Sequence, residues 1–191
     1  MKQVLHLNAE SLVGVERATG KLLWRVPLKT NAKRHVAMPL PLDGNRVVVC
    51  SHTFGMLCLK IARSGAEWKA TEDWLNKDLK VNLATSVAVG NHLYSHGAKK
   101  DFVCVDARTG VLMWSGEGFG KEFSSTLAIG DRLLVLTDSG ELALVSGDPS
   151  GFKERSRVQV CCNTWSFPDF SNGQLFVRDR RELSCIQLLE R

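Results

Sequence analysis

The chain of 191 residues contains 44% hydrophobic and 24% charged residues, which is ordinary for a globular protein. Its formal net charge is +5, but the basic residues are scattered and no ladder of aromatic residues accompanies them, so a nucleic-acid-binding groove is not expected. No stretch approaches the roughly 20 apolar residues that span a bilayer, and the N-terminus lacks the apolar core and cleavage site of a signal peptide. The composition therefore predicts a globular fold without a membrane span.

A turn followed by a burst of apolar residues recurs four times along the chain. The copies read LDGNRVVV, AVGNHLYS, AIGDRLLV and SNGQLFVR, and their turn glycines are Gly44, Gly90, Gly130 and Gly173. Successive glycines are 46, 40 and 43 residues apart, a period typical of arrays in which each repeat is one small structural unit. Because the repeats contain turn glycines and short alternating strands, they favour a β-propeller over a helical solenoid.

Each repeat is predicted to hold up to four short strands, which we term A to D in chain order. The five units cover residues 3–28, 36–74, 83–116, 124–160 and 165–188. Their strands are predicted at 3–7, 11–15 and 22–26; at 38–42, 46–51, 56–62 and 67–71; at 84–89, 92–96, 102–107 and 111–115; at 125–129, 132–137, 141–146 and 153–160; and at 165–170, 174–177 and 182–188. The first unit thus lacks strand A, and the last lacks strand D.

These two incomplete units predict an open ring. A closed propeller has about four to eight four-stranded blades, whereas the strands missing here belong to different blades. We therefore predict an all-β fold, a partial β-propeller ring of about three full and two incomplete four-stranded blades, as a single region over residues 1–191. Because exposed strand edges pair readily with other chains, we expect self-association or binding to the missing N-terminal blades of the same ring.

A second motif recurs at the end of the units. ERATGKLLW ends at Trp24 and DARTGVLMW ends at Trp114, with Gly20 and Gly110 in the turn before each tryptophan. These segments resemble the tryptophan-docking repeat of the PQQ-like β-propellers, a superfamily that includes quinoprotein alcohol dehydrogenases and the outer-membrane assembly lipoprotein BamB. The resemblance covers essentially the whole chain. It implies that each tryptophan lies flat on the outermost strand and covers the junction with the next blade.

The docking motif is degenerate in two units. ARSGAEW ends at Trp68, three residues after its glycine instead of four, and GDPSGF ends at Phe152. In the fourth unit Arg155 stands at the spacing where tryptophan is expected. The later part of the chain, ending in ELSCIQL, most resembles uncharacterised PQQ-like repeat proteins of planctomycetes. That resemblance implies the C-terminal part of a larger bacterial protein, with a periplasmic or otherwise exported location.

Three of the six cysteines fall at one point of strand C. Cys58, Cys104 and Cys185 share this position with Gly14 and Ala143. Because the residue there is always small, we predict that this strand position faces a neighbouring sheet too closely for a larger side chain.

Adjacent cysteines at Cys161–Cys162 form the most distinctive local feature. The resemblance to quinoprotein alcohol dehydrogenases implies a disulfide between such a pair, lying against the PQQ ring. A quinoprotein also needs oxygen ligands for Ca²⁺, and Asn163, Asn82 and Glu122 are expected near the same face without forming an acidic cluster. The other interpretation is chance adjacency or a partly buried thiol pair. We expect no cofactor, with PQQ and Ca²⁺ as the alternative.

Other catalytic patterns are missing from the sequence. It contains no nucleophile elbow, P-loop or dinucleotide-binding glycine motif. His92 and His96 share one face of a strand, but a metal site would need further ligands. The aromatic residues of TWSFPDF, which are Trp165, Phe167 and Phe170, are predicted to pack the inner strand of the last unit.

The leading functional hypothesis is a non-catalytic β-propeller scaffold that presents loops to a protein or polymer, as a BamB-like module would. This hypothesis rests on fold analogy and on the lack of an assembled catalytic set. The alternative is a fragment of a PQQ-dependent alcohol dehydrogenase, for which Cys161 and Cys162 are the candidate cofactor residues. A carbohydrate-associated domain is a third class that no residue specifically supports.

Overall fold

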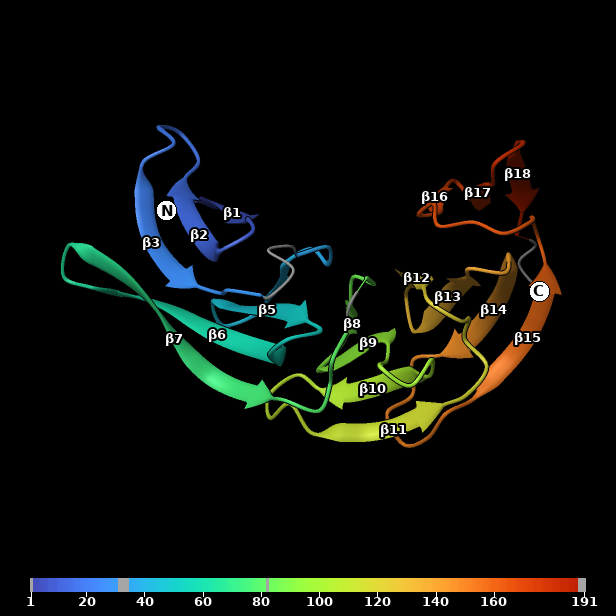
Figure 1. Ribbon diagram of the computed structural model, residues 1–191, viewed down its shortest axis with the longest axis horizontal. Coiled ribbons are helices and arrows are strands. Elements are labelled where there is room, and N and C mark those ends of the chain that lie inside the picture. The colour runs from blue at the N-terminus through green and yellow to red at the C-terminus, as the bar shows by residue number, and fades with distance from the viewer. Residues whose placement is uncertain (1, 31–34, 82, 189–191) are drawn as a thin grey trace. The chain divides into compact units, whose positions relative to one another are not determined.

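The structure, a computed structural model, describes residues 2–30, 35–81 and 83–188 (Figure 1). Within these ranges the chain forms eighteen strands in five antiparallel sheets. The same residues form no helix, so none that is long and apolar enough to cross a membrane. Three sheets have four strands and two have three, which confirms the predicted all-β propeller class of three full and two incomplete blades. The chain divides into two compact units, Met1–Thr85 and Ser86–Arg191.

The first unit contains blades 1 and 2. Blade 1 has the strand order β1 (Gln3–Leu7), β2 (Ser11–Glu16), β3 (Leu22–Pro27). Blade 2 has the order β4 (Leu40–Leu42), β5 (Arg46–Ser51), β6 (Gly55–Ser64), β7 (Glu67–Asn76). The β6 and β7 strands have ten residues each, twice the length of β1, and together they form a long hairpin.

The second unit contains blades 3, 4 and 5. Blade 3 consists of β8 (Val87–Val89), β9 (His92–His96), β10 (Phe102–Asp106) and β11 (Leu112–Gly116). Blade 4 consists of β12 (Ser124–Ile129), β13 (Arg132–Thr137), β14 (Glu141–Ser146) and β15 (Glu154–Gln159). Blade 5 consists of β16 (Asp169–Ser171), β17 (Gln174–Arg178) and β18 (Leu183–Gln187). In every blade the strands are neighbours in chain order, as meander connections require.

The middle strands of blades 2, 3 and 4 contribute most of the buried residues. In β5, β10 and β13 nearly every residue is buried. The turns between strands need backbone conformations that side chains resist, and glycine supplies them: Gly90 has a φ of 57° between β8 and β9, and Gly110 a φ of 73° before β11.

The strand register corrects the predicted docking positions. Gly14 pairs with Trp24 and Cys104 with Trp114, whereas Cys58 pairs with Trp74. Blade 2 therefore places Trp74, and not Trp68, at the docking position, because the β6–β7 hairpin is longer than the spacing rule assumes. Trp68 pairs with Arg63 near the tip of that hairpin.

The fourth blade requires a similar correction. Ala143 of β14 pairs with Arg157 of β15, so Arg157 and not Arg155 occupies the place of the docking tryptophan. A bulge in the C–D pairing occurs directly after the small residue or one position later in each of the four hairpins.

The reason for the small residue on strand C also differs from the prediction. A Cβ atom added to Gly14 would overlap the indole ring of Trp24, which belongs to the next strand of the same blade. The large residue of strand D, and not a neighbouring sheet, therefore limits the size of the residue on strand C. Cys58 and Cys104 are fully buried at the equivalent position, and Cys185, which no D strand covers in the described range, is exposed.

Candidate functional site

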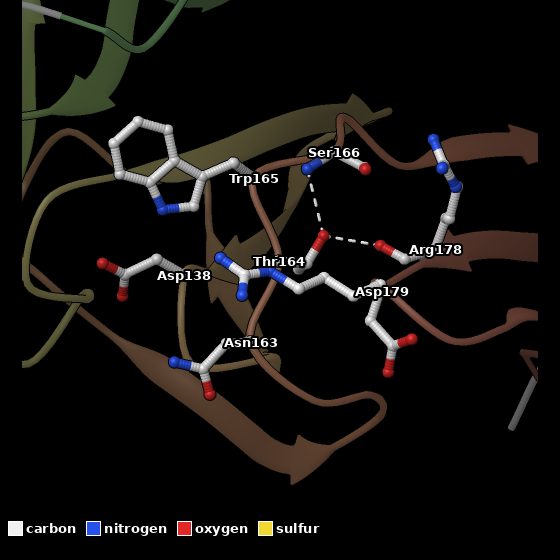
Figure 2. Close-up of a pocket in the computed structure, with 8 residues that line it drawn as sticks. Asp138, Asn163, Thr164, Trp165, Ser166, Arg178 and Asp179 are labelled. Atoms are coloured by element: carbon white, nitrogen blue, oxygen red, sulfur yellow. Dashed lines mark hydrogen bonds between the residues drawn. The ribbon is translucent and has the colours of Figure 1, made fainter.

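A groove with a volume of about 600 Å³ lies between blades 4 and 5 in the second unit (Figure 2). Three segments form it: the turn after β13, the connection that leads from blade 4 into blade 5, and the turn after β17. The residues that line it are Asp138, Asn163, Thr164, Trp165, Ser166, Arg178, Asp179 and Arg180.

Asp138 joins the two connections on either side of blade 4. Its buried carboxylate accepts hydrogen bonds from the backbone N–H groups of Lys121 (3.0 Å) and Glu122 (2.8 Å), which lie in the connection entering blade 4. Its backbone carbonyl accepts a hydrogen bond from the Thr164 N–H at 3.0 Å, in the connection entering blade 5. Asp138, the residue directly after β13, therefore holds both the connection entering blade 4 and the connection entering blade 5.

Asp179 plays the equivalent part in blade 5. Its carboxylate accepts backbone hydrogen bonds from Cys162 (3.0 Å), Arg181 (2.7 Å) and Glu182 (3.0 Å). Because the Arg181, Glu182 and Cys162 N–H groups favour the charged form, they lower the pKa of Asp179 to about 2. The carboxylate is therefore ionised and engaged by the backbone.

The connection between the blades is held at Thr164. The Thr164 hydroxyl donates to the Arg178 carbonyl and accepts a hydrogen bond from the Ser166 N–H, as Figure 2 shows. Between these anchors Trp165 is 61% exposed, with its ring centroid 5.9 Å from that of Phe123. The anchors therefore hold the backbone on both sides of a large exposed aromatic side chain.

This arrangement corrects the predicted role of the TWSFPDF aromatics. Trp165 and Phe167 do not pack an inner strand, because β16 begins only at Asp169 and both side chains are more than half exposed. Phe170 does pack, against the cluster formed by Leu134, Leu142 and neighbouring residues of blades 4 and 5.

The Arg178 and Arg180 side chains contribute the groove's cationic groups. Neither guanidinium forms a hydrogen bond or ion pair with another residue of the described ranges, although the Arg178 backbone carbonyl is engaged by Thr164. Arginine has five N–H donors in a planar fork, which suits carboxylate and phosphate acceptors. The site can therefore bind an acceptor-rich ligand.

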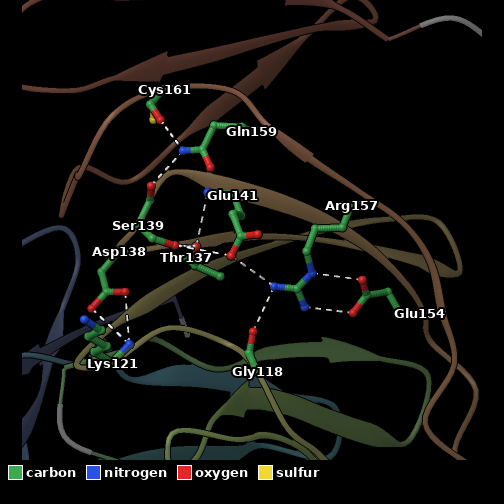
Figure 3. A network of polar contacts seen from close by, with 10 residues as sticks. All are labelled: Gly118, Lys121, Thr137, Asp138, Ser139, Glu141, Glu154, Arg157, Gln159 and Cys161. Atoms are coloured by element: carbon green, nitrogen blue, oxygen red, sulfur yellow. Dashed lines mark hydrogen bonds and ion pairs between the residues drawn. The ribbon is translucent and has the colours of Figure 1, made fainter.

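Arg157 lies at the centre of a polar network on the outer strand of blade 4 (Figure 3). Its guanidinium donates two hydrogen bonds to the Glu154 carboxylate, at 2.9 and 2.8 Å, and one to the Gly118 carbonyl at 2.8 Å. A longer ion pair of 3.5 Å reaches Glu141, and the guanidinium carbon lies 4.8 Å from the ring centroid of Phe119. Arg157 thus ties strand D to the connection that enters blade 4.

The Cys161–Cys162 pair lies directly before the groove-lining connection. The six cysteines, all within the described ranges, form no disulfide, so the pair is present as two thiols. Burial raises the pKa of the Cys161 thiol, and the negative charge of Asp179 raises it further by a smaller amount. Gly140 allows the backbone of the pair to approach closely, since a Cβ atom there would overlap both cysteine carbonyl oxygens. Binding of PQQ at this pair stays a prediction.

The other predicted residues are placed as follows. Asn163 lines the groove beside Asp138, and the Glu122 backbone bonds to Asp138, whereas Asn82 lies outside the described residues. His96 is buried and its Nδ1 shares a hydrogen bond of 3.2 Å with the Ser124 hydroxyl. Because Ser124 is fully buried, this serine–histidine pair is closed to a substrate. Within the described ranges no group of three or more His, Cys, Asp or Glu could hold a metal ion.

Sequence reasoning missed Asp138 and Asp179. Both directly follow the apolar burst of strand B, and the same place holds Asn8 in blade 1 and Ser51 in blade 2, each accepting hydrogen bonds from backbone N–H groups two or three residues later. Blade 3 has Gly97 there. A short polar residue one step beyond the burst was the signal that alignment of the repeats could have revealed.

The fold and these repeated turns define a β-propeller of the PQQ-like repeat type. Residues 1–115 match the sequence profile of the family described as outer membrane protein assembly factor BamB, and since this is more than half of the chain, the chain belongs to that family. Among curated proteins no match was found.

Solved structures agree on the fold. The crystal structure of BamB from Moraxella catarrhalis matches with a TM-score of 0.52 and 13% identity, over 100% of this chain and 68% of that one. The WD40 domain of SCAP from fission yeast matches with a TM-score of 0.55 and 11% identity, over 91% and 48%. The N-terminal domain of Nup159 matches with a TM-score of 0.51 and 13% identity, over 83% and 41%. At these identities the likeness shows the fold alone, and the chain spans less than half of the last two.

Proposed function

We propose that the chain is a non-catalytic β-propeller scaffold that binds a partner protein in the groove between blades 4 and 5. The observation that carries the proposal is Trp165, a large exposed aromatic residue on a connection that Asp138 and Thr164 hold in place. Aromatic residues fixed beside arginine are typical of the few side chains that supply most of the binding energy at protein interfaces. Phe167, 52% exposed, is a second exposed aromatic residue on the same connection.

The family match supports this role. The matching family is described as an outer membrane protein assembly factor. We propose the same kind of activity here, in the periplasm, with a protein or another polymer as the partner. Rigid blades suit this role because a preorganised surface loses little conformational entropy on binding.

A cross-linking experiment tests the proposal. A photo-reactive phenylalanine analogue replaces Trp165 in one variant and Leu112, an exposed residue of β11, in the control. We expect one discrete cross-linked protein from position 165 in cells and none from position 112. Equal cross-linking at both positions, or none at 165, would overturn the proposed docking site.

A titration of the purified chain with PQQ tests the alternative function as a PQQ-dependent dehydrogenase. Calorimetric titration with PQQ, with and without Ca²⁺, is expected to show no saturable binding. Calcium-dependent binding that disappears in the Cys161→Ser, Cys162→Ser double variant, together with PQQ-dependent dye reduction, would instead assign the chain to the quinoprotein class.

A further inference from the structure

The charges of the groove are not equally available to a ligand. Formally the two arginines balance the two aspartates among the lining residues. However, the Asp138 carboxylate already binds two backbone N–H groups, and the Asp179 carboxylate binds three. The backbone N–H groups thus engage both anions.

The cations remain open to a ligand. The Arg178 and Arg180 guanidinium groups make no hydrogen bond or ion pair within the described ranges, and both side chains are exposed. They contrast with Arg157, whose guanidinium is bound by Glu154, Glu141 and the Gly118 carbonyl. A ligand that enters the groove can therefore accept hydrogen bonds from these guanidinium groups. A carboxylate is well suited to this, because it accepts two parallel hydrogen bonds from one guanidinium.

The indole adds a requirement for apolar contact. Trp165 lies between anchored residues and contacts the ring of Phe123, and most of its indole remains exposed to a ligand. An apolar side chain can pack on that face while neighbouring carboxylates reach the arginines. An extended peptide advances about 3.3 Å per residue, so residues a few positions apart along one segment can supply both kinds of contact.

We infer that the groove binds an extended acidic segment of the partner protein, in which carboxylate side chains pair with Arg180 and Arg178 and an apolar side chain packs on Trp165. This inference rests on the proposed function, because it specifies the chemistry of the partner at the same site.

Fluorescence anisotropy with synthetic peptides tests it. The probe is a fluorescein-labelled peptide, Gly-Glu-Leu-Glu-Phe-Glu-Gly, and the matched probes carry Gln or Lys in place of every Glu. At low ionic strength we expect the Glu peptide to bind about tenfold more tightly than the Gln peptide and to weaken as salt is added. The Lys peptide is expected not to bind.

Two neighbouring arginines provide the matched variants. Arg180→Gln removes a groove-lining cation and is expected to weaken binding of the Glu peptide about tenfold. Arg181→Gln removes the same charge one residue away, from a side chain outside the groove lining, and is expected to leave binding unchanged. Trp165→Ala is expected to weaken binding of both the Glu and the Gln peptide.

Several results would overturn the inference. They are equal affinities for the Glu and Gln peptides, equal effects of the Arg180→Gln and Arg181→Gln variants, or tighter Arg180-dependent binding of polygalacturonate than of the Glu peptide. If Glu and Gln peptides bind alike and Trp165→Ala removes both, the acidic partner is wrong while the docking groove stands. Absence of all peptide binding overturns the acidic partner, and the cross-linking at position 165 then judges the proposed function separately.

Discussion

The indole of Trp24 lies where a side chain on Gly14 would have to be. The two residues are paired across β2 and β3, and the ring covers the Gly14 backbone while its Nε1–H donates a 2.7 Å hydrogen bond to the Gln3 side chain on β1. Three strands of one blade are therefore joined by a single side chain. The same combination of a small residue on strand C and a tryptophan opposite it on strand D occurs in the pairs Cys58 with Trp74 and Cys104 with Trp114.

This relationship predicts that Gly14→Ala destabilises blade 1. The new methyl group would overlap Trp24 and force the ring or the strand to move, a type of overpacking that costs about 1 to 3 kcal/mol. Urea unfolding followed by tryptophan fluorescence measures the free energy of unfolding. Gly151→Ala is the control, because a Cβ atom there has nothing within 4 Å. Equal stability of the two variants would contradict the tight contact.

The corrected docking position in blade 2 gives a second prediction. Trp74 is 9% exposed, so Trp74→Ala should lower the free energy of unfolding by about 3 to 5 kcal/mol. Trp114→Ala should cost about 3 kcal/mol, because Trp114 packs on Tyr94, Phe102 and Phe152. Trp68→Ala, at a half-buried place in the hairpin extension, should cost clearly less than Trp74→Ala. A larger effect at Trp68 would restore the spacing-based assignment.

Asp179 predicts a loss of stability in acid. Its pKa is lowered to about 2 by backbone hydrogen bonds, below the value of about 3.9 expected in the unfolded chain. The stabilisation is therefore complete above about pH 4 and is lost as the pH falls towards 2. In Asp179→Asn the free energy of unfolding should fall less steeply over this window than in the wild type. Asp131→Asn, an exposed residue of the same unit, is the control and should retain the wild-type slope.

The cysteines should react in two groups. Burial raises the pKa of both Cys58 and Cys104 to about 11, which leaves little thiolate near pH 8, and both side chains are fully covered. Cys162 and Cys185 are exposed. Titration with Ellman's reagent should therefore show two fast thiols in the native protein and six after unfolding. Fast reaction of Cys104, located by mass spectrometry, would show that the C–D hairpin of blade 3 opens in solution.

Much of the fold could be predicted because strand B is a short apolar run bounded by a turn glycine. The predicted bounds of β5, β9 and β13 agree with the structure at every residue. Strand A was harder to place, since these strands are short and follow long connections. The structure starts β16 at Asp169, four residues after the predicted start at Trp165.

The site was less predictable, because it depends on contacts between segments far apart in the sequence. Cys161–Cys162 drew attention as an unusual dipeptide, yet the adjacent connection is fixed by Asp138 and Asp179, which look like ordinary turn residues. Trp68 fitted the motif spacing better than Trp74 because spacing assumes equal hairpin lengths. Only the pairing of β6 with β7 reveals the extra residues.

The C–D pairings and the aspartates after strand B bear on how the number of blades could change in evolution. Each pairing of a small C residue with a large D residue lies inside one hairpin, although Trp114 also contacts Phe152 of the next blade, and each aspartate after strand B binds the connection entering its own blade. A duplicated blade would carry both its own pairing of strands C and D and the aspartate that binds the preceding connection. Gene duplication can therefore supply these two features of a new blade together, whereas the apolar core between blades, such as the cluster that contains Phe102 of blade 3 and Val135 of blade 4, must still fit.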